Sequence, residues 1–344
     1  MKNPWAALFI ALITLAGAAA APERTIPART LPTPSTVSPA LQEVIAPAWP
    51  GAPDPSHYST AQWKDYIRGR NAAREPFLRS LKQKFNVTVR AGMLAGVRVY
   101  RVIPDVIAEE NRRRLLVHVH GGAYILYGGE IATTEAILMA HYGQIEVVSV
   151  DYRMPPDFPF PAALDDTVAV WREVIKGHTP LNVGLFGTSA GGGLTLATVI
   201  KLKELGLPLP GALMAGTPWS DLTKTGDTYY THEYVDNVLG TNDGRLEAAA
   251  KLYAGTHDLK EPLLSPVYGD FSGFPPTILL SGTRDLFLSN TVRVQQKLLQ
   301  AGVPADLLVF EGESHAQYAS AIEAPESAAA FREVAHFFNA HLDK

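Results

Sequence analysis

The sequence predicts an α/β fold in which a mostly parallel central sheet is flanked by helices and carries a helical cap. Two observations predict it. From about residue 60 onward, short apolar runs alternate with segments of helical periodicity, as in strands joined by crossover helices. The stretch 216–262 interrupts this alternation with aromatic and polar residues. It therefore reads as an insertion over the end of the sheet.

Five short apolar runs are expected to be strands buried on both faces; they cover residues 115–119, 146–150, 183–186, 277–280 and 306–310. Before them, apolar residues alternate between positions 87 and 101, which predicts an antiparallel hairpin.

Helical periodicity predicts helices over 60–84, 131–141, 161–176, 191–205, 244–254, 288–301 and 325–342. We expect the first of these helices to be interrupted at Pro76. The segments 40–85 and 216–262 are together expected to build the cap.

The N-terminus has the features of a secretory signal peptide over residues 1–20. Lys2 precedes an apolar run, Trp5–Leu15, and small residues follow it. The run is too short to span a bilayer comfortably, so we expect cleavage after Ala20 and a periplasmic or secreted protein without a stable membrane span. An uncleaved membrane anchor is the alternative.

Residues 21–58 are rich in proline and are expected to form an irregular arm. This leaves residues 59–344 as one catalytic domain with its cap. Apolar residues make up 47% and charged residues 19% of the 344, so the chain can bury a sizeable core. Its net charge of −4 gives no sign of the excess positive charge that nucleic-acid-binding proteins carry. Without cysteine, disulfides, thiolate metal sites and cysteine nucleophiles are excluded.

Residues 187–191 read Gly-Thr-Ser-Ala-Gly, a G-x-S-x-G motif between a predicted strand and a predicted helix. In that setting the flanking glycines permit a sharp turn that exposes the serine, so Ser189 is the candidate nucleophile. The alternative, a phosphate-binding loop, fails because no lysine follows the glycines and the spacing is not G-x-G-x-x-G.

A nucleophilic serine needs donors for the developing oxyanion. His120-Gly121-Gly122-Ala123 follows the apolar run 115–119 directly. We expect the N–H groups of Gly121, Gly122 and Ala190 to form this oxyanion hole. The alternative for the two glycines is an ordinary turn between a strand and a helix.

The serine also needs a base and an acid that orients the base. Among ten histidines, His315 stands in the loop between a predicted strand and the last helix, and Asp285 likewise follows a strand. The chain order Ser189, Asp285, His315 is the order used with this type of serine turn. Glu311 and Glu313 are rival acids, but they lie too close along the chain to His315.

Four motifs together resemble the bacterial hormone-sensitive-lipase-like esterases: His-Gly-Gly at 120–122, Asp-Tyr-Arg at 151–153 with Pro155 and Pro156, Phe-Pro-Phe-Pro-Ala-Ala-Leu-Asp-Asp at 158–166, and the serine motif at 187–192. The resemblance covers residues 60–342. It implies an α/β-hydrolase fold with a helical cap and hydrolysis of short-chain, small-molecule esters through an acyl-enzyme, without a metal or cofactor. It also implies a possible homodimer formed through the last strand, Leu307–Phe310.

Three positions depart from the common pattern of that family. Ala123 replaces a third glycine, Thr188 stands where aspartate is commoner, and Ala316-Gln317 follows the histidine. The substrate contacts expected here are Ala123, Tyr124, Trp219, Tyr234, Val238 and Gln317. The aromatic residues of the cap could either line the substrate pocket or form the hydrophobic core of the cap, and the two alternatives have equal weight. These residues include Trp63, Tyr229 and Tyr230.

Other functions use similar sequences. A lactone hydrolase belongs to the same group of proteins, and an amidase or peptidase would use the same three residues. A binding module that kept only the fold would usually lack the nucleophile.

The stretch from Asp151 to Asp166 is expected to be structural, with Asp165 or Asp166 as partner of Arg153.

Overall fold

The computed structural model describes residues 23–343. The chain divides into two units, Met1–Pro32 and Thr33–Lys344. In the first unit, residues 23–32 are exposed and form no helix or strand. The predicted signal peptide lies outside the described residues. No helix in the described part of the chain is long and apolar enough to cross a membrane.

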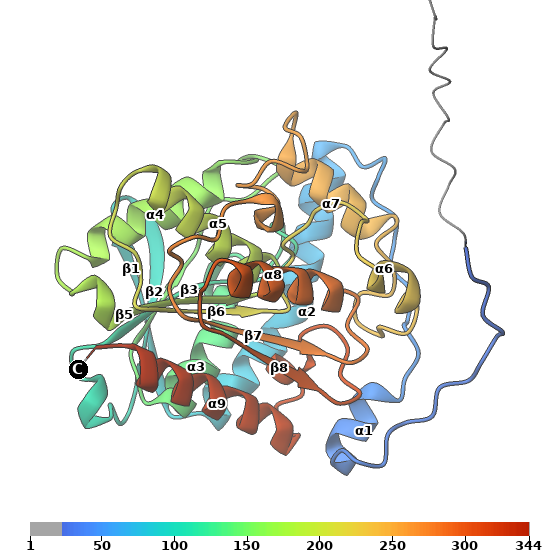
Figure 1. The fold of residues 1–344 in the computed structure, drawn as a ribbon, viewed down its shortest axis with the longest axis horizontal. Helices are drawn as coiled ribbons and strands as arrows, with labels where there is room; N and C mark the ends of the chain where they lie inside the picture. Colours follow the sequence, from blue (N-terminus) through green and yellow to red (C-terminus); the bar gives the residue numbers. More distant parts are fainter. Residues whose placement is uncertain (1–22, 344) are drawn as a thin grey trace, which may run out of the picture. The chain divides into compact units, whose positions relative to one another are not determined.

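The second unit is built on an eight-stranded sheet in the order β1-β2-β4-β3-β5-β6-β7-β8 (Figure 1). Strands β1 and β2 form an antiparallel hairpin, β2 pairs antiparallel with β4, and every later pairing is parallel. This confirms the mostly parallel sheet. The strands are β1 Val87–Leu94, β2 Val97–Pro104, β3 Leu115–Val119, β4 Val147–Val150, β5 Val183–Thr188, β6 Ala212–Gly216, β7 Thr277–Gly282 and β8 Ala305–Phe310.

Helices cover both faces of this sheet. Helices α3 and α9 pack together on one face, and α4, α5 and α8 lie on the other (Figure 1). The remaining helices are α1, α2, α6 and α7. The bounds are α1 Pro39–Ile45, α2 Thr60–Lys84, α3 Thr134–Gly143, α4 Ala162–Val174, α5 Ala190–Glu204, α6 Thr228–Thr231, α7 Arg245–Ala254, α8 Leu288–Gln300 and α9 Pro325–His341.

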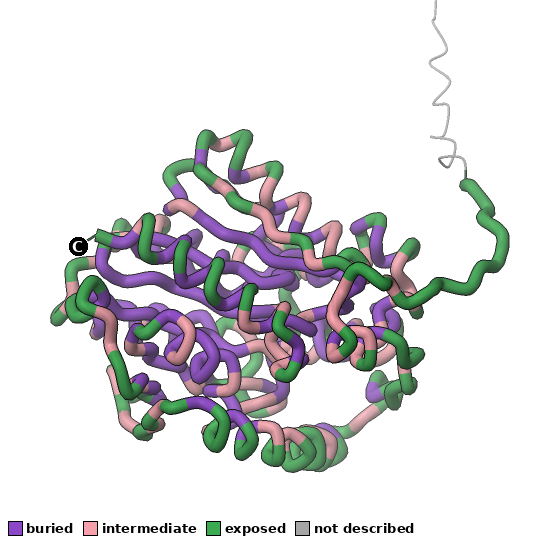
Figure 2. The backbone as a smooth tube through the Cα atoms, turned by 90° about the horizontal axis from the view of Figure 1, so that it is seen from below, coloured by how far each residue is buried: buried purple, intermediate pink, exposed green. Residues whose placement is uncertain are grey.

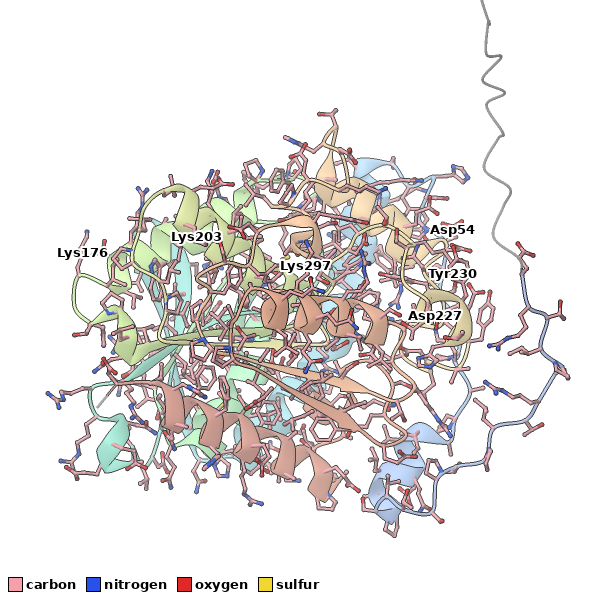
Figure 3. The ribbon with its side chains drawn as sticks, viewed as in Figure 1. Asp54, Lys176, Lys203, Asp227, Tyr230 and Lys297 are labelled. Atoms are coloured by element: carbon pink, nitrogen blue, oxygen red, sulfur yellow. The ribbon has the colours of Figure 1, made fainter. Side chains whose placement is uncertain are left out.

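Successive residues of the central strands alternate between two hydrophobic cores, as the period of a strand requires. In β5, Leu185 packs into the core under α4, α5 and α8, whereas Phe186 packs against Phe338 of α9. Both faces of the sheet are therefore covered, and the buried backbone follows the strands (Figure 2). The outer helix surfaces carry charges instead: Lys203 pairs with Asp270, and Lys297 donates to the carbonyl of Gly269 (Figure 3).

Strand β6 was not predicted from the sequence. It reads Ala-Leu-Met-Ala-Gly, and all five residues are buried. So short an apolar run does not distinguish strand from helix by periodicity. Its pairing with β5 and β7 creates the element, and its last residue, Gly216, lies beside Thr188 in the register.

The predicted interruption at Pro76 is wrong, because α2 runs unbroken through it. Proline removes an N–H donor and crowds the carbonyl of residue i−4, which is Ala72. Both residues are exposed, so water can solvate the freed carbonyl and a gentle bend is accommodated. The buried residues of α2 are Trp63, Leu78 and Leu81, on the other side of the helix.

The predicted arm is not irregular throughout, because α1 forms within it. Ser38 caps this helix and also donates from its N–H and its hydroxyl to the Glu326 carboxylate, each at 2.7 Å. Leu41 and Ile45 pack against Ala321 and Ala324. A seven-residue helix is marginal by itself, so these tertiary contacts account for α1.

In the stretch between Asp151 and Asp166, the ion pair of Arg153 has a structural role. Of the two expected partners, the structure pairs Asp166 with Arg153. The buried Asp166 carboxylate accepts the Arg153 backbone N–H at 2.8 Å and its guanidinium at 2.7 Å. Asp165 is exposed.

We expect Asp166→Ala to lower the free energy of unfolding by roughly 1–3 kcal/mol, since it removes the buried acceptor that binds both the Arg153 N–H and its guanidinium. Asp165→Ala is the matched control. It removes an exposed carboxylate from the first turn of α4 and should cost less than about 1 kcal/mol. Urea unfolding of both variants measures the difference, and equal losses would contradict this assignment.

Candidate active site

Ser189 lies at the sharp turn between β5 and α5. Its backbone has φ 64° and ψ −123°, which is rare for a residue other than glycine. The surrounding backbone holds this conformation in place. The Ser189 N–H donates to the Gly216 carbonyl at 2.8 Å, and its own carbonyl accepts the N–H groups of Trp219 and Gly193 at 2.9 and 3.0 Å.

The two glycines of the motif are explained by the end of β3, which passes directly over this turn. A Cβ on Gly187 would lie 2.2 Å from the Val119 carbonyl oxygen, and one on Gly191 would lie 2.0 Å from the same atom. Neither distance leaves room for a side chain. The G-x-S-x-G pattern is therefore a requirement of strand packing at this point.

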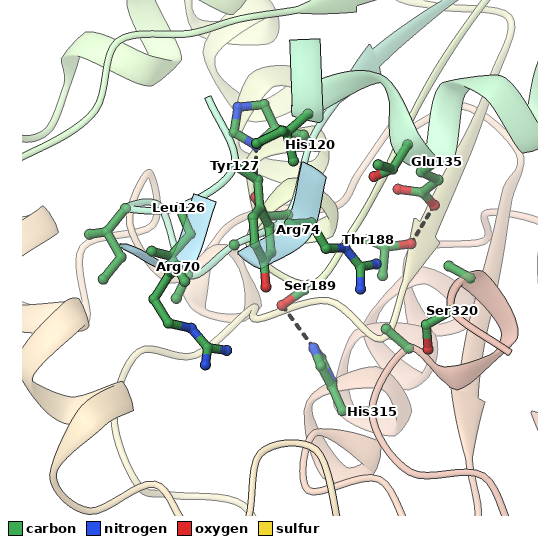
Figure 4. A pocket seen from close by; sticks show the side chains of 18 of the residues that line it. Arg70, Arg74, His120, Leu126, Tyr127, Glu135, Thr188, Ser189, His315 and Ser320 are labelled. Atoms are coloured by element: carbon green, nitrogen blue, oxygen red, sulfur yellow. Dashed lines mark hydrogen bonds between the residues drawn. The ribbon is translucent and has the colours of Figure 1, made fainter. Parts of the chain in front are cut away.

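The structure brings His315 and Asp285 to Ser189, as expected. His315 Nε2 lies 2.8 Å from Ser189 Oγ (Figure 4), and its Nδ1 lies 3.1 Å from Asp285 Oδ1. Since the Asp285 carboxylate can only accept, the hydrogen-bond pattern places the His315 proton on Nδ1 and leaves Nε2 free to accept the serine proton.

Asp285 is fully buried and surrounded by donors. Its carboxylate accepts the hydroxyls of Thr217 and Ser281 and the N–H of Phe287. Burial acts to raise the pKa of Asp285, but the charge and hydrogen bond of His315, together with the Thr217 hydroxyl, outweigh it and hold that pKa below its ordinary value. Asp285 is thereby kept as a carboxylate.

A second buried carboxylate, Asp236, was not anticipated. Its Oδ1 accepts the N–H groups of Val238 and Leu239 in the cap, and its Oδ2 accepts those of Leu286 and His315. It therefore ties the cap to the loops that carry Asp285 and His315. Burial, and then the nearby Asp285 charge, raise the pKa of Asp236. No motif marks this residue in the sequence.

The three expected oxyanion donors lie around Ser189. The hydrogen bonds among residues 23–343 leave the N–H groups of Gly121 and Gly122 without a partner. Ala190 is the first residue of α5, where an N–H has no acceptor within the helix. Gly121 also passes close to the nucleophile: a Cβ there would lie 3.4 Å from Ser189 Cβ. All three donors can thus face an oxyanion.

His120, which precedes these glycines, is held rigidly. Its ring stacks on Tyr152 with centroids 4.1 Å apart, and its Nδ1 lies 2.7 Å from the Gly121 carbonyl. The Tyr152 hydroxyl in turn donates to the His120 carbonyl at 2.6 Å. Burial lowers the pKa of His120 to about 3, so this histidine is neutral and orients the glycine loop.

Thr188, just before the nucleophile, connects to a buried polar network. Its hydroxyl donates to the Glu135 carboxylate and lies 2.7 Å from the Tyr318 hydroxyl. The other Glu135 oxygen lies 3.1 Å from His118 Nε2. These contacts give Thr188 a positioning role behind Ser189 and identify Glu135 and Tyr318 as further residues that sequence reasoning missed.

Ser189 and His315 open into a pocket of about 230 Å³. Of the expected substrate contacts, Ala123 and Val238 line it. Tyr124 and Trp219 do not: both are buried in the core, where Tyr124 stacks on Tyr253 at 3.9 Å. Tyr234 lies on the surface of the cap, 62% exposed, and packs against Trp49.

Gln317 is also outside the pocket lining. Its side-chain Oε1 accepts the Ser314 N–H at 2.7 Å, and its side-chain Nε2 donates to Asn237 Oδ1 at 2.9 Å and to the Val44 carbonyl at 3.4 Å. Gln317 therefore fastens the loop of His315 to the cap and to the end of α1. Trp63 and Tyr229, which could have lined the pocket, are core residues, and Tyr230 is exposed.

No group of three or more histidine, aspartate or glutamate side chains in the described residues is arranged to hold a metal ion.

Three arginines line the pocket and were not anticipated: Arg70, Arg74 and Arg245. The four-residue spacing of the first two on a predicted helix was the available signal, since it places both on one face.

Comparison with known proteins gives a consistent picture. A family model described as the α/β hydrolase fold matches residues 116–319. An acetyl-hydrolase of Streptomyces hygroscopicus is 35% identical over 56% of this chain, and the match spans 64% of its own length. An esterase of Acinetobacter venetianus is 30% identical over 68% of this chain and 76% of its own.

Solved structures are also similar. The structure of an esterase called E25 has a TM-score of 0.89 at 43% identity, covering 93% of this chain and 99% of that one. An esterase from the bacterial hormone-sensitive lipase family has a TM-score of 0.77 at 27% identity, covering 89% of this chain and 99% of that one.

Glu313, one of the rival acids, generates a prediction about pH. This residue is 1% exposed. Burial raises the pKa of Glu313 to about 8, although the Tyr318 backbone N–H acts to lower this pKa. A carboxyl whose pKa is raised on folding destabilises the native state as pH climbs from its unfolded pKa toward about 8.

We therefore expect Glu313→Gln to gain stability relative to the wild type as pH rises from 5 to 8, by at most about 1.4 kcal/mol per pH unit. Glu311→Gln, an exposed neighbour, is the control and should show no such gain. Thermal unfolding at pH 5, 6.5 and 8 decides it, and a constant difference between Glu313→Gln and wild type would refute the burial argument.

Proposed function

Because the chain belongs to the α/β-hydrolase family, and within it to the esterases that resemble bacterial hormone-sensitive lipase, we propose that it hydrolyses short-chain carboxylic esters through an acyl-serine intermediate. The observation that carries the proposal is the continuous chain of hydrogen bonds from Ser189 Oγ through His315 to Asp285, at 2.8 and 3.1 Å. The backbone N–H groups of Gly121 and Gly122, which have no partner among residues 23–343, lie beside this chain of hydrogen bonds.

In the acylation step, His315 Nε2 takes the Ser189 proton as the serine oxygen attacks the ester carbonyl. The Asp285 carboxylate holds the imidazole in the tautomer that can accept this proton and stabilises the imidazolium that forms. The Gly121, Gly122 and Ala190 N–H groups donate to the oxyanion. His315 then protonates the leaving alcohol, and the acyl-enzyme remains.

In the deacylation step, the same histidine removes a proton from water as water attacks the acyl-enzyme carbonyl. The oxyanion is held by the same three donors, and collapse of the intermediate returns the proton to Ser189. Since Asp236 anchors the His315 N–H and two N–H groups of the cap, it keeps the base and the cap in register through both steps.

Pocket size and lining support short acyl chains. The cavity of about 230 Å³ is closed by the apolar cap residues Val238, Leu239 and Leu246. Ala123 carries a methyl group beside the oxyanion glycines, where a third glycine would leave more room. We expect a cavity of this volume to hold an acyl chain of a few carbons better than a long one.

Two further expectations stay predictions. Export to the periplasm or the medium depends on residues 1–20, outside the described part of the chain. A homodimer through β8 is supported by its position at the edge of the sheet and by Val309, whose apolar side chain is 41% exposed. Size-exclusion chromatography with light scattering measures the dimer directly.

We expect Ser189→Ala to lose ester turnover by roughly 10⁴-fold or more, since the acyl-enzyme cannot form. The variant should also fail to react with a fluorophosphonate probe, while its circular dichroism spectrum stays unchanged. Ser80→Ala, which alters an exposed serine of α2, is the control. More than trace activity in purified Ser189→Ala would overturn the assignment of the nucleophile.

For a series of p-nitrophenyl esters, we expect kcat/KM to be highest for acyl chains of a few carbons and to fall for long chains. Val238→Ala removes part of the apolar lining and should shift the optimum toward longer chains. A rate that rises steadily with chain length in the wild type would contradict the proposed pocket.

A further inference from the structure

The cations of helix α2 divide into two groups. Five of them form ion pairs with carboxylates. Arg70 and Arg74 form no ion pair and no hydrogen bond with any residue in the described part of the chain. The five paired cations are Lys64, Arg68, Arg79, Lys82 and Lys84.

The two unpaired arginines are the ones that line the pocket of Ser189. Figure 4 shows both side chains extending from α2 into this pocket. Arg245 of α7 lines this pocket too, and its one hydrogen bond within residues 23–343 goes to the Val238 carbonyl at 3.4 Å. Three guanidinium groups thus border one small cavity.

This arrangement is costly for the protein alone. Arg70 and Arg74 are four residues apart on one helix, where like charges repel. Arg74 is half-buried, with its guanidinium 3.9 Å from the centre of the Phe77 ring. Loss of solvation lowers the pKa of Arg74; the nearby Tyr127 opposes this, and the Arg70 charge adds to it. A bound anion would relieve both costs.

No carboxylate of the pocket is available to do this. Glu135 is the acid among the lining residues, and its two oxygens are occupied by the Thr188 hydroxyl and by His118. The arginines therefore face the cavity without a protein counter-ion.

The position of α2 is fixed relative to the oxyanion loop. Asn71, between the two arginines, accepts the Tyr127 N–H at 2.8 Å, and Tyr127 follows the loop that begins at Gly121. The arginines therefore keep a set place relative to the oxyanion donors. A ligand that reaches both sites has to carry a negative charge as well as its ester.

We propose that this enzyme selects esters that carry a carboxylate, and that Arg70 and Arg74 are the residues that bind this group. The guanidinium geometry matches a carboxylate through paired hydrogen bonds, and Arg245 of α7 adds positive potential to the same pocket. The proposal rests on the proposed esterase function and names its substrate class.

The test compares each carboxylate ester with its neutral amide isostere. On the alcohol side these are 3-acetoxybenzoate and 3-acetoxybenzamide. On the acyl side they are monoethyl glutarate and ethyl 4-carbamoylbutanoate. We expect the wild type to show at least about tenfold higher kcat/KM for the carboxylate in one of the two pairs, equivalent to one charge-assisted hydrogen bond. The pair that shows it tells which part of the ester carries the charge.

The double variant Arg70→Gln/Arg74→Gln should lose this preference, so that the ratio of the two kcat/KM values falls about tenfold or more. Arg70→Lys/Arg74→Lys keeps the charge and should retain part of it. Arg68→Gln/Arg79→Gln, which alters paired cations on the outside of the same helix, should leave the ratio unchanged. Raising NaCl from 50 to 500 mM should reduce the wild-type ratio.

Equal turnover of carboxylate and amide in both pairs, or an unchanged ratio in the double glutamine variant, overturns the proposal. If either result is found while neutral esters are still hydrolysed, the proposed esterase function is unaffected. Absence of turnover for all four esters and for p-nitrophenyl acetate would instead reject the proposed function.

Discussion

The site depends on the close approach of two parallel strands where β3 and β5 end. The Val119 carbonyl stands where side chains at Gly187 and Gly191 would be. With those side chains absent, the end of β3 crosses the serine turn and sets Gly121 against Ser189. This packing contact goes together with the unusual backbone of Ser189 and places the Gly121 loop, the proposed oxyanion hole, beside it.

Buried carboxylates then hold the rest of the site to this turn. Asp285 orients His315, and Asp236 binds the backbone of both the His315 loop and the cap. Each carboxylate is surrounded by donors, which offsets the cost of burying its charge. Glu135 has the same role behind Thr188. Three acids from separate segments therefore keep loops of low intrinsic order in one geometry.

The cap adds both charged and apolar groups to this core. Helix α2 pairs its outward cations with carboxylates, while its inward face turns Arg70 and Arg74 toward the pocket. The apolar residues Val238, Leu239 and Leu246 close the other side. The same small cavity thus combines an apolar lining with positive charge.

The sequence by itself determined the alternation of strands and helices, the Ser189 motif and its candidate partners, because these depend on local patterns and on chain order. The tertiary structure decided the rest. Strand β6 exists through its neighbours, α2 continues through Pro76 because that face is solvated, and Tyr124 and Trp219 belong to the core. Asp236 has no local signature, and the spacing of Arg70 and Arg74 places them on one helix face without showing which site that face meets. Their roles arise from residues far apart in sequence, and only packing brings those together.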